Sequence, residues 1–158
     1  MKHRTTRHRA MRLGTALLAA AAAGTLAAAP ANAVEPTTAT LAFDCGSIGS
    51  GQATLTAAQD GTTATIELST SALTSPWPID ANSVSSTLTL TKNGSDSATF
   101  TGNANPAVPA GGAVSTGPLT GEVAAGDSLE ATSLTIVVFG FTVTCNATSP
   151  QDPGPFVF

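Results

Sequence analysis

Several residue types on which active sites depend are scarce in this chain. Tyrosine is absent, and the two histidines, His3 and His8, both lie near the N-terminus. After residue 33 the sequence has no histidine and no arginine, and Lys92 is its one lysine. Histidine is the usual general base near neutral pH and a leading metal ligand, so this region cannot assemble a Ser-His-Asp or Cys-His site or the common zinc sites. We therefore expect no catalytic residue, no metal, no cofactor and no enzymatic activity.

Carboxylates are the one catalytic side-chain type that stays abundant after residue 33. All ten aspartates and glutamates lie there, scattered and without the D-x-D-x-D-G pattern of a calcium loop. Two of them brought together in space could hydrolyse a glycoside. Because no local motif supports such a pair, acids on the solvated surface are the preferred interpretation, and a carboxylate enzyme is the weakest hypothesis.

The same region is strongly acidic. It has one basic against ten acidic residues, a formal net charge of −9, whereas the whole chain has −4. Proteins bind phosphate backbones through Lys and Arg, which displace counterions. We therefore expect no nucleic-acid partner, and the charge also disfavours anionic membrane surfaces.

The first 33 residues have the parts of a secretory signal. A basic segment (1–12) precedes an apolar one (13–29), and Ala31-Asn32-Ala33 forms a small-x-small site, which predicts cleavage between Ala33 and Val34. The alternative is an N-terminal membrane anchor. The apolar run is at the short end of what spans a bilayer and leads directly to the cleavage site, which favours a cleaved signal. No later segment is long and apolar enough to span a membrane, so we expect a secreted protein, extracellular or associated with the cell envelope.

Short runs of alternating apolar and hydroxyl side chains dominate the rest of the chain. In residues 85–91, for example, Ser86, Leu88 and Leu90 share one face and threonines occupy the other. This alternation is typical of antiparallel strands with one solvated face. Turn sequences at 59–62 and 92–96 each join two such runs and predict hairpins.

About seven such strands predict an all-β fold, an immunoglobulin-like antiparallel β-sandwich, with a small β-barrel as the alternative. The expected domain covers residues 39–149, between a flexible lead (34–38) and a Pro-rich C-terminal tail (150–158). We interpret residues 117–123 as a loop that leads into a strand. The final Phe-Val-Phe is expected to pair as a last edge strand, with a free docking tag as the alternative.

The two cysteines, Cys45 and Cys145, each share a strand face with apolar neighbours, so both thiols should point into the core. In an exported protein such a pair predicts a disulfide. A bridge over about 100 residues should stabilise the fold by roughly 4.7 kcal/mol in the chain-entropy model. The alternative is two buried free thiols that act as small apolar side chains.

The single tryptophan, Trp77, lies between Pro76 and Pro78, which favour rigid extended backbone. A rigid loop that presents an aromatic face suits recognition of a sugar or a peptide, and Asp80 offers a nearby polar partner. The alternative is that Trp77 folds back to cap the end of the sandwich. With one Trp and six Phe in the chain, a core role is the preferred interpretation.

Three short motifs resemble a family of actinobacterial secreted domains of unknown function. They are "FDCGSIG" around Cys45, "TGPLTG" (116–121) and "TVTCNATSP" around Cys145, and the likeness spans residues 41–150. Members have a signal peptide and one all-β domain rich in Thr, Ser and Ala, so the resemblance implies the fold and export but no activity. The chain is also broadly similar to the acidic, sandwich-fold carrier proteins of antibiotic chromophores, which use two short-range disulfides instead of one long one.

These observations favour a secreted, non-catalytic domain that acts by binding or assembly at the cell envelope or outside the cell. The second hypothesis is a small-ligand carrier or a carbohydrate-binding module, with Trp77 and Asp80 at its site.

Overall fold

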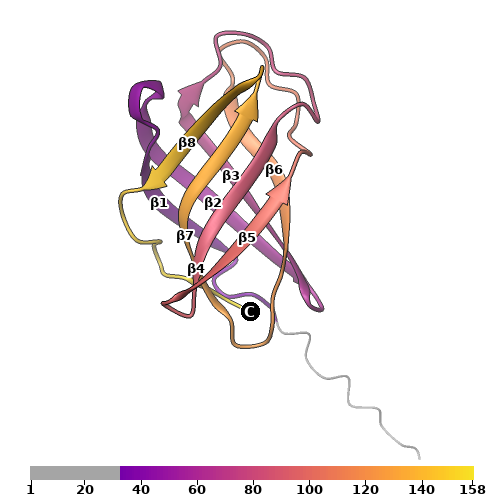
Figure 1. The fold of residues 1–158 in the computed structure, drawn as a ribbon, viewed down its shortest axis with the longest axis vertical. Coiled ribbons are helices and arrows are strands. Elements are labelled where there is room, and N and C mark those ends of the chain that lie inside the picture. The colour runs from indigo at the N-terminus through magenta and orange to yellow at the C-terminus, as the bar shows by residue number, and fades with distance from the viewer. Residues whose placement is uncertain (1–32) are drawn as a thin grey trace, which may run out of the picture.

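Nine β-strands and one short 3-10 helix make up residues 33–158, the part of the chain that the computed structural model describes (Figure 1). The signal-peptide prediction falls on residues 1–32, outside the described residues, and stays a prediction. The elements are β1 (Thr38–Asp44), η1 (Gly46–Ile48), β2 (Ser50–Asp60), β3 (Thr63–Thr74), β4 (Ser85–Lys92), β5 (Asp96–Gly102), β6 (Ala113–Glu122), β7 (Ser128–Val138), β8 (Phe141–Ala147) and β9 (Phe156–Val157).

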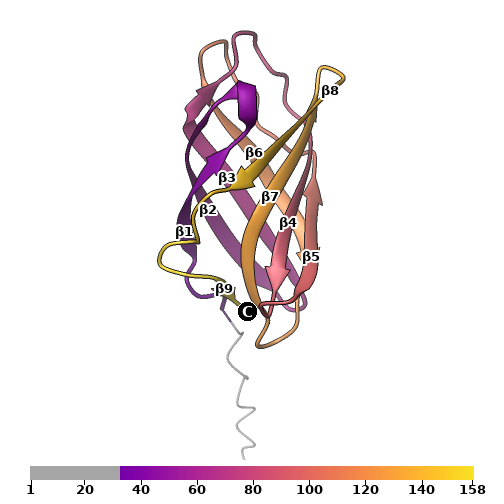
Figure 2. The same ribbon diagram turned by 60° about the vertical axis from the view of Figure 1, so that its left-hand side comes forward.

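Strands β1 to β8 form a closed antiparallel barrel, and β9 lies outside it. The order around the barrel is β1-β2-β3-β6-β5-β4-β7-β8, and β8 pairs with β1 to close the ring. Strand β9 pairs with the start of β7, at the end of the molecule that holds the C-terminus (Figure 2). The all-β prediction is confirmed, and the barrel alternative is correct.

The sandwich prediction is wrong because two seams join what would otherwise be two separate sheets. Strands β1 and β8 meet over two residue pairs, and β5 and β6 meet at one, Thr101 with Thr120. Strands β4 and β7, by contrast, pair along the full length of β4. An inward-apolar and outward-polar alternation occurs in sandwiches and barrels alike, so it cannot distinguish them.

The interpretation of residues 117–123 as a loop is also wrong, because β6 continues to Glu122. The alternation breaks there: Thr116 and Gly117 are adjacent and both buried, and the pairing with β3 shifts register at this point. Gly117 has φ +64°, and a Cβ at this position would collide with the carbonyl of Ala104. A bulge that needs glycine therefore hides the strand from a period-two search.

Both predicted hairpins are present. Asp60 pairs with Thr63 across the β2–β3 turn, and Lys92 pairs with Asp96 across the β4–β5 turn. In the second turn Asn93 and the following glycine both have positive φ, as a type I′ turn requires.

Large apolar side chains fill the end of the barrel that holds these two turns, which we call the closed end. Its fully buried residues include Leu55, Ile66, Leu90, Phe100, Leu119, Leu129 and Phe156. The C-terminal residues complete it: β9 pairs with β7 as the expected edge strand, and Phe158 is buried. The expected flexible lead is held here as well, because Val34 is buried and Glu35 pairs with Val157.

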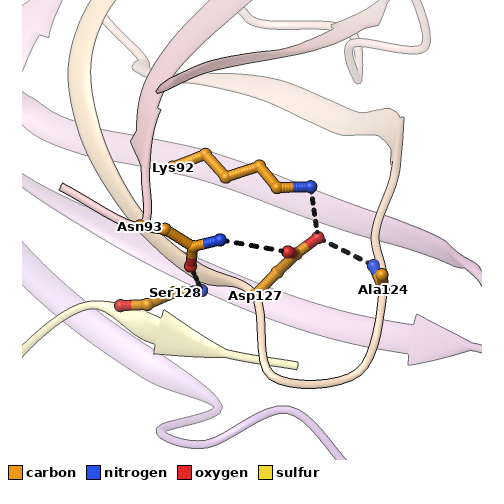
Figure 3. A network of polar contacts seen from close by, with 5 residues as sticks. All are labelled: Lys92, Asn93, Ala124, Asp127 and Ser128. Atoms are coloured by element: carbon orange, nitrogen blue, oxygen red, sulfur yellow. Dashed lines mark hydrogen bonds and ion pairs between the residues drawn. The ribbon is translucent and has the colours of Figure 1, made fainter. Parts of the chain in front are cut away.

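A half-buried ion pair fixes the loop before β7 to the closed end (Figure 3). Lys92 Nζ donates to Asp127 Oδ2 at 2.7 Å, and the same oxygen accepts from the backbone N–H of Ala124 at 2.8 Å. Asn93 bridges the turn to β7, since its Oδ1 accepts from Ser128 N at 2.9 Å. The hydrogen bond from Lys92, with that from Ala124, holds the pKa of the Asp127 carboxyl below its ordinary value of 3.8, although burial opposes the shift.

Candidate functional site

A cavity of about 410 Å³ opens at the other end of the barrel, which we call the open end. The 3-10 helix, the β3–β4 and β5–β6 loops and the β7–β8 turn all lie at this end, uppermost in Figure 1. Small-molecule sites generally measure about 300–1,000 Å³, so the cavity is of a size that holds a modest organic ligand.

Several inward positions that line the cavity carry small side chains. Ala53 of β2, Ser86 of β4, Ala131 of β7 and Ala147 of β8 all line it. At the closed end Leu, Ile and Phe side chains, packed with Ala39, Ala57 and Ala64, fill the interior. A barrel of eight strands has an interior that side chains can just fill, so smaller residues leave room for a ligand.

A second apolar cluster forms one side of the cavity. Ile79 and Val108, from the two long loops, pair through two backbone hydrogen bonds of 2.8 and 2.9 Å. Both are buried with Val84, and Ile136 and Val138 of β7 lie against them. The loops are therefore joined into one wall of the cavity.

Asn105 locks these loops in place. It is 1% exposed, its Oδ1 accepts from the backbone N–H groups of Ser83 and Val84, and its Nδ2 donates to the carbonyls of Asp80 and Pro106. All four hydrogen bonds of the amide are thus formed within the protein. The sequence held no signal for this role beyond an asparagine in a Pro- and Gly-rich loop.

Four exposed hydrophobic side chains surround the mouth, and we call them the apolar rim: Ile48, Trp77, Phe139 and Phe141. They are 58, 67, 58 and 73% exposed, respectively. Exposed apolar side chains that gather at one place mark binding surfaces more often than scattered ones do. The prediction of a core role for Trp77 is wrong, because the end that it was expected to cap is open.

Asp80 does not accompany Trp77 at the cavity. Its carboxylate is exposed, and its backbone carbonyl accepts from Asn105 and from Ser83 Oγ. The structure therefore separates the two residues that the sequence grouped as a ligand site. The backbone carbonyl of Asp80 helps to hold the loop, whereas Trp77 lies at the mouth of the cavity.

The predicted disulfide between Cys45 and Cys145 is confirmed. It lies just beyond the two residue pairs of the β1–β8 seam, and Cys145 also lines the cavity. The bridge therefore closes the barrel toward its open end. Structural disulfides are typical of extracellular or otherwise oxidising surroundings.

The cavity wall is uncharged and contains one buried polar atom without a partner. None of the residues in 33–158 that line it is Lys, Asp or Glu. Ser86 is 2% exposed, and its Oγ has no hydrogen-bond partner among the described residues. The chain's one lysine after residue 33, Lys92, is engaged with Asp127 at the closed end.

Within the described part of the chain, no helix has the length and hydropathy needed to cross a bilayer. Comparisons of the chain with protein-family models, with curated proteins and with solved structures give no match.

Proposed function

We propose that the protein is a non-catalytic binding protein that carries one small apolar molecule in the open end of its barrel. The observation that carries this proposal is the uncharged cavity of about 410 Å³ beneath an exposed apolar rim. The protein acts outside the cell or at its envelope, as the signal-like N-terminus and the disulfide favour.

The size of the cavity sets the size of the ligand. A protein cavity of about 150 Å³ lined by aliphatic and aromatic side chains binds benzene. A volume of about 410 Å³ therefore suits a molecule two to three times as large as benzene. Each methylene of such a ligand gains about 0.8 kcal/mol on leaving water, which supplies the driving force for binding.

A sugar is a poorer fit than an apolar molecule, although Trp77 offers an aromatic face. Sugar recognition needs free hydrogen-bonding groups, and the amide of Asn105 in the cavity wall is already committed to the loops. The other large rim residues, Phe139 and Phe141, have apolar side chains. The wall thus favours hydrocarbon contact over polar contact.

The test is a titration of the disulfide-bonded protein with N-phenyl-1-naphthylamine, a neutral fluorescent probe of suitable size. Its emission should rise in the cavity, and the fluorescence of Trp77, the one tryptophan, should respond because this residue stands at the mouth. Val143→Phe fills the cavity from β8, whereas Thr144→Phe adds the same ring to the exposed face of the same strand.

We expect Val143→Phe to weaken binding about tenfold or more, equivalent to about 1.4 kcal/mol, and Thr144→Phe to leave it unchanged. Ala147→Leu provides a second, milder block from the same strand. Failure of the wild type to bind the probe, or equal binding by blocked and control variants, would overturn the proposal. Binding of oligosaccharides that Trp77→Ala abolishes would replace it with the carbohydrate hypothesis.

A further inference from the structure

We infer that the carried molecule is a neutral apolar compound with one hydroxyl or carbonyl oxygen, and that Ser86 binds this oxygen inside the cavity. The inference rests on the proposed function and names the class of its ligand.

Ser86 lies on the inward face of β4, in phase with Leu88 and Leu90. Its backbone belongs to the pairings with Gly102 of β5 and Ile136 of β7, so the strand position is fixed on both sides. The residue is 2% exposed and lines the cavity. A hydroxyl is thus held among apolar side chains in the middle of a sheet.

This hydroxyl is exceptional among the buried polar groups of the wall. Thr116 also lines the cavity, but its Oγ1 donates to the carbonyl of Gly117 at 2.7 Å and accepts from Leu68 N at 3.1 Å. Ser86 Oγ has no partner within residues 33–158. Folded proteins satisfy the large majority of buried polar groups, and an unsatisfied one is costly, so a partner supplied by the ligand explains why serine occupies this position.

The hydroxyl is free to turn toward a ligand. No hydrogen bond within the described residues holds its side chain in one rotamer, and serine moves readily among three staggered positions. A hydroxyl both donates and accepts, so it can pair with an alcohol or with a carbonyl oxygen.

The oxygen must belong to a neutral group. No charged residue in the described range lines the cavity, and the ammonium of Lys92 is at the closed end, 2.7 Å from Asp127. A carboxylate or phosphate buried beside a single hydroxyl would lose its hydration without a cation to replace it. With a net charge of −9 after residue 33, the protein also repels anions. Neutral lipid alcohols and ketones remain.

The test uses nonane, the nonanol and nonanone isomers, and nonanoate as competitors for bound N-phenyl-1-naphthylamine. The isomers carry the oxygen at each position along the hydrocarbon chain. The isomer whose oxygen lies at the depth of Ser86 should bind most tightly. We expect the best isomer to bind about tenfold more tightly than nonane to the wild type, and nonanoate to bind no better than nonane. Ser86→Ala should remove this preference, so that nonane and the best isomer compete equally well for the probe-binding site.

The matched control is Ser85→Ala, which removes an exposed hydroxyl one residue away. Ser86→Ala should also be at least as stable as the wild type, because it removes an unsatisfied buried group, whereas loss of a purely structural hydroxyl would lower the melting temperature. Equal affinity for nonane and every isomer, or tightest binding of nonanoate, overturns the inference while probe binding leaves the proposed function intact. Absence of probe binding overturns the proposed function itself.

Discussion

Removal of the disulfide should lower stability by an amount that the spacing of its cysteines sets. Cys45 and Cys145 are 100 residues apart, so the bridge closes nearly the whole barrel into one loop. In the chain-entropy model a loop of this length is worth about 4.7 kcal/mol. Small domains are stable by only about 5–15 kcal/mol, so the Cys45→Ala/Cys145→Ala variant should be marginal.

The same figure predicts a shift in melting temperature. The entropy of unfolding is about 2.1 cal/mol/K per residue, or roughly 0.26 kcal/mol/K for the described part of the chain. A loss of 4.7 kcal/mol therefore lowers the melting temperature by about 18 °C. Calorimetry of the wild type and the double variant, with urea denaturation to obtain the free energy of unfolding, measures both quantities.

The loss of stability should also be localised within the barrel. The β1–β8 seam has two residue pairs and the backbone hydrogen bond from Thr148 N to Ala42 O, so its amides should gain the most hydrogen exchange in the variant. Amides of the long β4–β7 pairing should gain the least. A change in stability under about 1 kcal/mol, or equal acceleration at both places, would refute the view that the bridge closes the barrel.

Three further predictions concern the closed end. The pKa of Asp127 lies below its ordinary value because of Lys92, so the ionised carboxylate should stabilise the fold above about pH 4. That contribution should be lost as the pH falls through the lowered pKa. The loss of stability caused by Asp127→Asn, measured by urea denaturation, should therefore shrink between pH 6 and about pH 2.5. Gly121→Ala should cost about 1–3 kcal/mol in the same assay, because its Cβ would lie 2.6 Å from the buried ring of Phe100. Phe156→Ala should cost about 3–5 kcal/mol, because the side chain of this β9 residue is fully buried.

Exposed neighbours serve as controls for the last two predictions. Thr120 is adjacent to Gly121, and Val157 is adjacent to Phe156; both are exposed. Thr120→Ala and Val157→Ala should therefore change the free energy of unfolding by less than about 0.5 kcal/mol. Equal losses in the exposed and buried variants would contradict the packing argument. For Asp127→Asn, a stability deficit that stays constant down to pH 2.5 would show that the carboxylate does not titrate as described.

Local features of the fold were predictable from the sequence, and its closure was not. The alternation in residues 85–91 and the turns at 59–62 and 92–96 depend on neighbouring residues, and the structure contains all of them. The pairing of β3 with β6, and of β8 with β1, joins segments that are far apart in the chain. No short-range pattern specifies such pairs, so the same strands were equally compatible with a sandwich.

The sequence carries one signal for the cavity. The alternation in residues 85–91 puts Ser86 on an inward face with Leu88 and Leu90, where a side chain of their size would fill the interior. Small residues at inward positions of several strands predict a cavity only once the strands are known to meet at one end. The prolines beside Trp77 correctly indicated a loop, but burial of its ring depends on whether that end of the barrel is covered.

The length of strand β7 separates the two ends of the described chain from the mouth of the cavity. The first residues of β7 pair with β9, near residue 35, whereas its last residue, Val138, is followed directly by the rim residue Phe139. A tag or surface joined at either end of the described chain therefore stands about eleven strand residues away from the mouth, or roughly 35 Å at about 3.3 Å per residue. Protein immobilised through its C-terminus should therefore present the apolar rim to solution.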